Sequence, residues 1–125
     1  MKILMASSEA LPFAASGGLA DVVGSLPAAL RKRIVGCRVV MPLYDDIAPE
    51  LRAQMQFIGS LTVPVSWRQQ YCGVFEARAN GVIYYLLDNQ YYFKREGLYG
   101  FYDDGERFAF FARAVLDILP MIGYK

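Results

Sequence analysis

The sequence of 125 residues is 55% hydrophobic, which supplies enough apolar side chains for one domain with one core. Its formal net charge is +1, with acids and bases interspersed, so it lacks the basic stripe that is typical of proteins that bind nucleic acid. No stretch approaches the roughly 20 apolar residues that cross a bilayer, and no signal-peptide core follows Met1. We therefore expect no nucleic-acid or membrane partner and a cytoplasmic location.

The sequence contains no histidine, which excludes a Ser-His-Asp triad, a Cys-His pair and a histidine-ligated metal within these residues. Cys37 and Cys72 lie in separate strand-like runs and form no close pair of metal ligands. We therefore expect two buried, reduced thiols rather than a redox or metal site.

The first third of the chain has the pattern of a right-handed parallel β-α-β unit. Residues 2–6 and 37–41 are apolar runs typical of strands that are buried on both faces. Between them, the spacing of five apolar residues predicts a helix over 19–33, in which Pro27 should cause a kink near Gly24. The predicted apolar face of this helix consists of Leu19, Val22, Val23, Leu26 and Leu30.

A long loop over residues 7–18 joins the first strand to this helix and ends in Ser16, Gly17 and Gly18. Long loops at the carboxyl end of a parallel strand usually line a cleft. Two glycines let the backbone approach a ligand, and the following helix presents unpaired N–H groups and the positive end of its dipole. The pattern is typical of a phosphate site, and a simple tight turn is the alternative.

The middle of the chain predicts an antiparallel hairpin beside the parallel strands. After a weak helical turn over 49–55, residues 57–67 and 71–79 are β-rich runs, which we expect to be joined by residues 68–70. Pro64 favours an edge position for the first of them.

A strong turn signal, Asn80-Gly81, leads into a further buried strand over 82–87. The aromatic segment 91–102 has no periodicity and is predicted to be a second loop at a strand end. Asp103 and Glu106 resemble a capping box for a final helix that Pro120 ends. The predicted apolar face of that helix consists of Phe108, Phe111, Ala112, Val115, Ile118 and Leu119.

Four runs of sequence together resemble one known family. They are Ser7-Ser8-Glu9-Ala10-Leu11-Pro12-Phe13, Gly17-Gly18-Leu19-Ala20-Asp21-Val22-Val23-Gly24-Ser25-Leu26-Pro27, Val39-Val40-Met41-Pro42-Leu43-Tyr44 and the segment from Asp88 to Gly100 with Asp104, Glu106, Arg107, Phe108 and Ala109 after it. These runs cover nearly the whole chain. They resemble the N-terminus of bacterial glycogen synthases and plant starch synthases.

The resemblance implies an α/β fold, a Rossmann-like parallel sheet with an antiparallel hairpin, in the N-terminal domain of a GT-B glycosyltransferase. Residues 1–125 would be the first part of that domain, without the C-terminal nucleotide-sugar domain, and inactive alone. The implied activity is transfer of glucose from ADP-glucose to the non-reducing end of an α-1,4-glucan, with retention at the anomeric carbon. The family implies no metal and no other cofactor.

The same resemblance implies that the backbone of Ser16, Gly17 and Gly18 meets the diphosphate of the sugar nucleotide. Oriented N–H groups would there stabilise the negative charge that grows on the leaving phosphate. Ala15 stands where the family usually has a lysine, which removes one cationic phosphate partner.

Four further residues are candidates for contacts with the sugar or the acceptor. Asp21 would contact sugar hydroxyls or cap the helix, and Glu9 would do the same or fix its loop by a hydrogen bond. Phe93 and Arg95 suit a carbohydrate surface on the acceptor side, with core packing as the alternative for the aromatic ring. The remaining carboxylates are expected to be caps and solvated turns rather than an acid/base pair, namely Asp45, Asp46, Asp103 and Asp104.

Two other classes of protein share this pattern. One is a non-catalytic module that binds a phosphate ligand through the same loop without transfer chemistry. The other is a dinucleotide-dependent reductase, which is disfavoured because Gly17-Gly18 lacks the Gly-x-Gly-x-x-Gly spacing.

Overall fold

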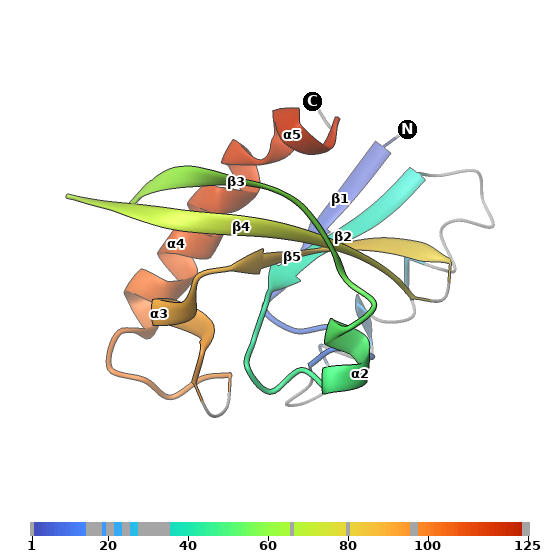
Figure 1. Ribbon diagram of the computed structural model, residues 1–125, viewed down its shortest axis with the longest axis horizontal. Helices are drawn as coiled ribbons and strands as arrows, with labels where there is room; N and C mark the ends of the chain where they lie inside the picture. Colours follow the sequence, from blue (N-terminus) through green and yellow to red (C-terminus); the bar gives the residue numbers. More distant parts are fainter. Residues whose placement is uncertain are drawn as a thin grey trace.

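The computed structural model describes residues 2–14, 19, 22–23, 26–27, 36–65, 67–79, 81–95 and 98–123. Its centre is a five-stranded mixed sheet with the strand order β1-β2-β5-β4-β3 (Figure 1). The predicted α/β fold is thereby confirmed. In sheet order, the strands are β1 (Lys2–Ala6), β2 (Gly36–Pro42), β5 (Val82–Asp88), β4 (Arg68–Ala79) and β3 (Gln56–Val65).

The parallel half of the sheet consists of β1, β2 and β5. β1 pairs with β2 in register Ile3 to Cys37, and β2 pairs with β5 in register Val39 to Tyr84. The central strand β2 is buried on both faces, as its apolar run predicted, since Val39, Val40 and Met41 are all 0% exposed. The strand over residues 2–6 is also present as predicted, but the expectation that it is buried on both faces is wrong, because β1 lies at an edge of the sheet, with Ile3, Leu4 and Met5 only partly buried and Ala6 exposed.

The predicted helix between β1 and β2 lies partly outside the described residues, including Leu30 and the kink near Gly24. Its described residues are helical, namely Leu19, Val22, Val23, Leu26 and Pro27. The predicted apolar face is only partly correct, because Val23 is buried whereas Leu19, Val22 and Leu26 are exposed. Val23 and Pro27 are four residues apart and both buried, so the buried face passes through this pair.

The antiparallel half confirms the predicted hairpin. β3 pairs with β4, and β4 pairs with β5, so β3 is an edge strand, at the antiparallel end of the sheet, as Pro64 indicated. The predicted turn over 68–70 is wrong, because β3 ends at Val65 and β4 already begins at Arg68. Gly81 has a φ of 74°, the left-handed conformation that the turn between β4 and β5 requires.

Besides the helical residues between β1 and β2, the described part of the chain forms the helices α2 (Pro49–Arg52), α3 (Gln90–Phe93), α4 (Asp104–Asp117) and α5 (Leu119–Ile122). α2 agrees with the predicted helical turn, whereas α3 lies at the start of a segment that we expected to be a loop. Figure 1 shows α4 running along one face of the sheet, across β3 and β4. None of the described helices is long and apolar enough to cross a membrane.

The face of α4 that packs on the sheet differs from the predicted one. Phe111 is buried as expected, but Phe108 and Val115 are only partly buried and Ala112 is exposed. The buried positions on α4 are Arg107, Phe110, Phe111 and Ala114. The apolar pattern missed this face because the face contains a charged residue, Arg107. The predicted face was therefore placed on the neighbouring apolar residues.

The core lies between the sheet and the elements that cover it. Large aromatic side chains fill it, and six of them are at most 2% exposed: Tyr44, Tyr84, Tyr85, Tyr92, Phe93 and Phe110. Cys37 and Cys72 are free and buried, as predicted. Burial raises the pKa of the Cys37 thiol and raises that of Cys72 to about 12, so both remain protonated at neutral pH.

Candidate functional site

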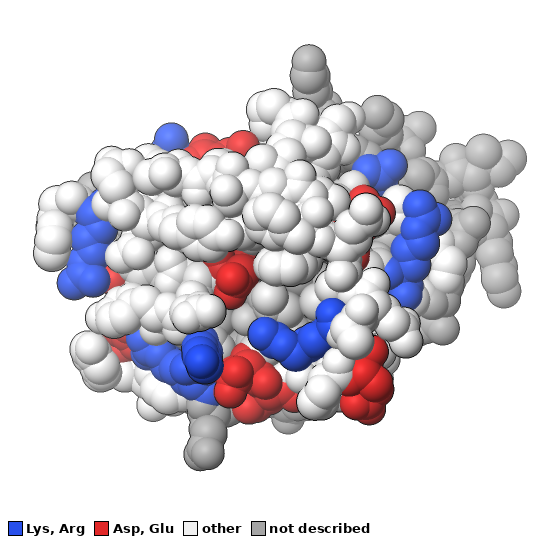
Figure 2. Space-filling model, in the orientation of Figure 1, with Lys and Arg blue, Asp and Glu red and all other residues white. Residues whose placement is uncertain are grey.

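The carboxyl ends of the three parallel strands meet at one edge of the sheet. Residues 7–14 follow β1, residues 43–47 follow β2, and residues 89–103 follow β5. In open α/β sheets, ligands bind outside this edge. Figure 2 shows acidic and basic side chains next to one another along the lower margin of the molecule, whereas uncharged side chains cover most of β3 and β4.

Glu9, in the loop after β1, is the most buried carboxylate among the described residues of this edge, with 2% of its surface exposed. The Tyr99 hydroxyl donates a hydrogen bond to Oε2 of Glu9 at 2.7 Å and lies 2.6 Å from the Ser8 hydroxyl. The Ser7 hydroxyl donates to the Glu9 carbonyl oxygen at 2.7 Å. The loop after β1 is thus joined to the aromatic segment after β5.

The loop after β2 joins the same cluster through Tyr44. Its hydroxyl donates to the Ser8 carbonyl oxygen at 2.7 Å, and its ring meets Phe93 edge-on at 5.7 Å. Burial raises the pKa of Tyr44, with the nearby Tyr99 and Glu9 adding to the shift, so this hydroxyl stays neutral and keeps its proton for the donation. All three loops of the edge therefore meet around Ser8 and Glu9, in what we call the Glu9 cluster: Ser7, Ser8, Glu9, Tyr44 and Tyr99.

Arg107 of α4 fixes the segment that carries Tyr99. It is 0% exposed, and its Nε donates to the Tyr92 carbonyl oxygen at 2.7 Å. Its Nη1 donates to the Leu98 carbonyl oxygen at 3.1 Å and to Asp104 at 2.8 Å. Its Nη2 has no hydrogen-bond partner among the described residues. A single buried guanidinium thus holds both ends of the segment from Tyr92 to Leu98 in place.

The predicted capping box is wrong. Asp103 is the N-cap of α4, but its carboxylate makes no side-chain cap and instead forms a two-point ion pair with Arg95. The Arg95 hydrogen bond holds the pKa of Asp103 below its usual range. Glu106 accepts from the Tyr92 hydroxyl and pairs with Arg68 at 3.5 Å rather than reaching back to the cap. The cause is competition, because each acid has a cation or hydroxyl from another element within reach.

The structure gives the following positions for the predicted site residues. Ser16, Gly17, Gly18 and Asp21 lie outside the described residues, as does Ala15. Glu9 accepts a hydrogen bond from Tyr99, which agrees with the alternative that this carboxylate fixes its loop. The binding roles of Ser16, Gly17, Gly18, Asp21 and Glu9 stay predictions.

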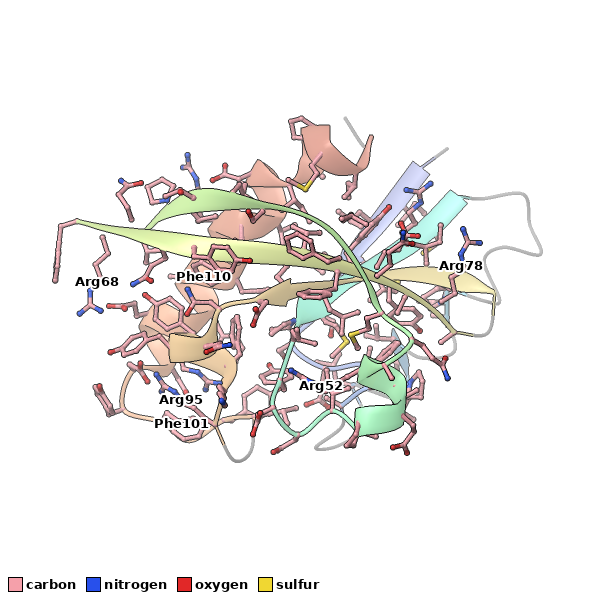
Figure 3. All side chains as sticks on the ribbon, in the orientation of Figure 1. Arg52, Arg68, Arg78, Arg95, Phe101 and Phe110 are labelled. Atoms are coloured by element: carbon pink, nitrogen blue, oxygen red, sulfur yellow. The ribbon has the colours of Figure 1, made fainter. Side chains whose placement is uncertain are left out.

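Phe93 is 0% exposed in the core, which agrees with the packing alternative for this ring. Arg95 donates through Nε and Nη2 to the Tyr91 carbonyl oxygen and lies over the Phe101 ring at 5.1 Å, as Figure 3 shows below α3. The structure therefore places Arg95 where it supports Tyr91, a residue that is 49% exposed. The acceptor-side role of Phe93 and Arg95 stays a prediction.

Tyr99 and Arg107 are the residues that sequence reasoning missed. Tyr99 lies in an aperiodic aromatic run, where no pattern distinguishes a hydroxyl that reaches the first loop from one that faces solvent. Arg107 did carry a signal, since a lone cation lies three and four residues before Phe110 and Phe111 on the buried face of α4. Among the described residues, no group of three or more Cys, Asp or Glu side chains could hold a metal ion.

Comparison with known proteins identifies the family. The family model described as "Starch synthase catalytic domain" matches residues 2–125. Glycogen synthases of Geobacillus thermodenitrificans and Clostridium kluyveri are 59% and 58% identical over all 125 residues. These residues are 26% of either relative, so the chain spans about a quarter of the length of the curated relatives it matches.

A solved structure agrees with this result. The catalytic domain of starch synthase IV from Arabidopsis thaliana, bound to ADP and acarbose, matches 99% of the chain with a TM-score of 0.91 and 25% sequence identity, over 26% of its own length. The whole sheet described above is therefore shared with that protein. With a family model matching nearly every residue and close relatives over the whole length, the chain belongs to the starch synthase catalytic domain family.

Proposed function

We propose that the chain is the N-terminal part of a GT-B glucosyltransferase that transfers glucose from ADP-glucose to the non-reducing end of an α-1,4-glucan. The observation that carries this proposal is the 59% identity to a glycogen synthase over every residue of the chain. The structural neighbour supports it, because that protein is bound to a nucleotide and to acarbose. The cytoplasmic location stays a prediction with it.

The donor side of the proposed enzyme is the loop after β1. Its described part is fixed by the Glu9 cluster, in which Tyr99 and Ser7 hold Glu9. A loop that is fixed in this way would present the backbone N–H groups of Ser16, Gly17 and Gly18 to the diphosphate without reorganisation during the reaction. Because Ala15 supplies no cation, the N–H groups and the part of the protein across the cleft would carry most of the phosphate binding.

The acceptor side of the proposed enzyme is the aromatic segment after β5. Tyr91, Tyr99 and Tyr102 are 49%, 41% and 93% exposed, and aromatic faces stack on the C–H faces of sugar rings. Phe93 would act from beneath as the packed support of this surface, and Arg95 would orient Tyr91. The glucan chain would then reach the donor loop across the Glu9 cluster.

The test of the function is transfer of radiolabel from ADP-glucose to glycogen by the full-length parent and by its Gly18→Val variant. A side chain at Gly18 would occupy the space of the diphosphate, so we expect at least a ~10²–10³-fold loss of turnover, the typical cost of one oriented donor. Gly105→Val is the matched control, because nothing lies within 4 Å of a Cβ at that position.

The melting temperature of each variant separates binding from folding. A Gly18→Val variant with full activity per folded molecule and a lowered melting temperature would mean that the glycine is needed only for a turn. A parent protein that binds ADP-glucose but never transfers its glucose would instead support the non-catalytic module.

A further inference from the structure

β3 is the outermost strand of the antiparallel half, and its free side has no neighbouring strand among the described residues. Figure 1 shows it on the outside of the sheet, next to α4 and α5. With ten residues it is twice as long as β1, the outermost strand of the parallel half, which has five. The main-chain N–H and C=O groups on the free side of such a strand can pair with a further strand.

The composition of β3 is unusual for a strand in this position. It contains no charged residue, although 20% of the residues in the chain are charged and every other strand of the sheet contains at least one. Soluble proteins usually protect a free strand with charged side chains, above all lysine, because an uncharged strand pairs with other chains.

The absence of charge on β3 favours one particular partner, a second copy of the same strand. In a contact between identical surfaces across a twofold axis, each charge near the axis would lie close to its own copy and be repelled. A strand that pairs with itself must therefore be uncharged where the two copies meet. β3 meets this condition over its whole length.

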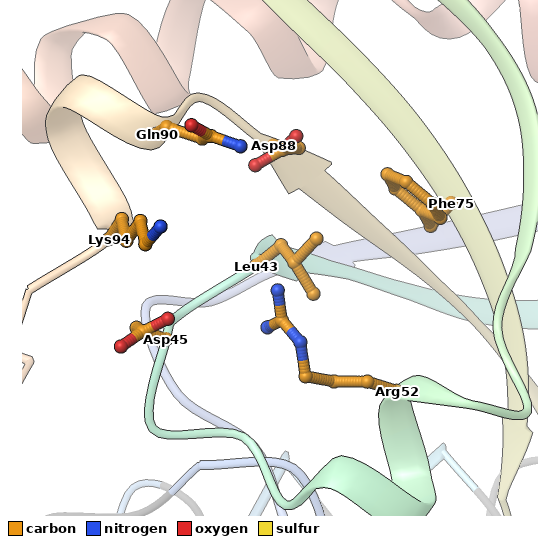
Figure 4. Close-up of a pocket in the computed structure, with 7 residues that line it drawn as sticks. All are labelled: Leu43, Asp45, Arg52, Phe75, Asp88, Gln90 and Lys94. Carbon is orange, nitrogen blue, oxygen red and sulfur yellow. The ribbon is translucent and has the colours of Figure 1, made fainter.

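Both ends of β3 are unsuited to a partner strand. Phe57 is already paired with Phe75 of β4, whose side chain lines the pocket drawn in Figure 4, and the two rings meet edge-on at 5.2 Å. The register with β4 shifts between Phe57 and Gly59, and an irregularity of this kind bends the strand. Pro64, near the other end, has no N–H group to donate. Regular pairing is therefore confined to the middle segment, residues 59–63.

The side chains of this middle segment complement one another across a twofold axis. Ser60 and Thr62 are exposed on one face, and Leu61 is partly buried on the face along which α4 runs. If two antiparallel copies are aligned with Leu61 opposite Leu61, then Ser60 of each copy lies opposite Thr62 of the other. Pairs of hydroxyl-bearing side chains at such positions stabilise antiparallel sheets.

The same contact would cover apolar side chains beside the segment. Ile58 and Met121 are 37% and 39% exposed. Met121 of α5 lies over Gly59, because a Cβ on that glycine would lie 3.3 Å from the methionine sulfur. Removal of this apolar surface from water would add to the main-chain hydrogen bonds in holding two copies together.

We propose that β3 is the contact strand of a homodimer, in which residues 59–63 pair antiparallel with the same residues of a second copy across a twofold axis. The contact joins the sheets of the two copies into one continuous sheet. It is also closed, because each copy has a single β3 and its free side is used up by the pairing. The proposal rests on β3 and its neighbours and not on the proposed transferase activity.

Analytical ultracentrifugation of the full-length parent, at concentrations up to about 100 μM, tests the proposal. We expect an equilibrium between monomer and dimer. Thr62→Lys brings two like charges together beside the axis, so it should raise the dissociation constant of the dimer at least ~10-fold. Thr62→Val keeps the strand uncharged and should leave the dimer intact. Thr62 is exposed, so neither change should disturb the fold, which circular dichroism checks.

Gln69→Lys is the matched control, since it adds the same charge at an exposed position of β4, one strand away from the free side. It should leave the dissociation constant unchanged. The proposal would be overturned by a parent that remains monomeric at the highest concentration, by association that continues beyond the dimer, or by a dimer on which Thr62→Lys acts no more strongly than Thr62→Val or Gln69→Lys. No glucose transfer is measured, so an inactive protein that dimerises in this way would contradict only the proposed function.

Discussion

At the scale of single residues, the edge of the sheet is organised by polar side chains that are already engaged. Glu9 holds Tyr99, Asp103 holds Arg95, and Arg107 holds the carbonyl oxygens of Tyr92 and Leu98. Buried polar groups are costly unless they are paired, so each of these contacts fixes the loop that carries it. These hydrogen bonds hold the segment that carries the exposed aromatic residues in a defined position.

Replacement of Tyr99 by phenylalanine tests the contact with Glu9. The variant removes a donor from a carboxylate that is 2% exposed, so we expect a loss of about 1–3 kcal/mol in the free energy of unfolding. Urea unfolding of both proteins measures the difference. Tyr102→Phe is the control, because Tyr102 is 93% exposed and the loss of its hydroxyl should leave the urea midpoint unchanged. Equal midpoints for the wild type and Tyr99→Phe would show that this hydrogen bond contributes no stability.

The pair of Arg95 and Asp103 makes stability depend on pH. The pKa of Asp103 is lowered in the folded state by the Arg95 hydrogen bond, so the carboxylate form is the stabilising one. This contribution is complete above about pH 4, the ordinary value for aspartate, and is lost as the pH falls through the lower folded value.

The difference in stability between wild type and Asp103→Asn should therefore be largest near neutrality and shrink as the medium becomes acid. Chemical unfolding across this range measures it. In an Arg95→Gln background the same substitution should show no such dependence on pH. A difference that stays constant with pH would exclude the ion pair as its source.

At the scale of elements, period and turn chemistry predicted every strand of the sheet. The apolar runs gave β1, β2 and β5, Pro64 indicated the edge, and Gly81 marked the turn before β5. What failed was local: the cap of α4, its buried face, the apolar face expected between β1 and β2, the burial of β1, the turn before β4 and the short helix α3. Asp103 shows the reason for such failures. It is the N-cap of α4, but its carboxylate accepts hydrogen bonds from Arg95 instead of capping the helix.

The candidate site could be predicted less fully than the fold. Glu9 was recognised from the family resemblance, whereas its partner Tyr99 is 90 residues away in the sequence. No local pattern reports a contact between two loops so far apart, since it depends on the strand order of the finished sheet.

The two glycines Gly81 and Gly105 test turn and helix chemistry with the same substitution. Gly81 has a φ of 74°, which a side chain disfavours, so Gly81→Ala should lower the free energy of unfolding by about 1 kcal/mol or more. Gly105 is in the first turn of α4 with open space around it, so Gly105→Ala should raise it by about 0.4–1 kcal/mol. Urea midpoints that move in the same direction for both would contradict this assignment of the two backbones.

At the scale of the whole molecule, the described residues would form one side of the site of the proposed enzyme. The sheet edge offers fixed loops and exposed aromatic rings, and several of its charged groups, including Glu9, Arg95, Asp103 and Arg107, are already held by partners within the chain. Transfer from a sugar nucleotide needs groups that surround the departing diphosphate and stabilise its growing charge. In the proposed enzyme those groups would lie mainly across the cleft, in the part that the relatives have beyond the matched quarter.

The last prediction follows from that division. The 125-residue chain, purified by itself, should transfer no glucose from ADP-glucose to glycogen, although it folds. Orientation of two reactants can supply roughly 7–11 kcal/mol of a barrier, and one side of a cleft cannot supply it, because the donor keeps its freedom to turn and leave. The measurement is incorporation of radiolabel into glycogen, with circular dichroism to establish that the chain is folded and with the full-length parent as the positive control. Label in glycogen above the protein-free blank would show that the transfer groups lie within these residues after all, and the loops after β1, β2 and β5 would then be the place to look for them.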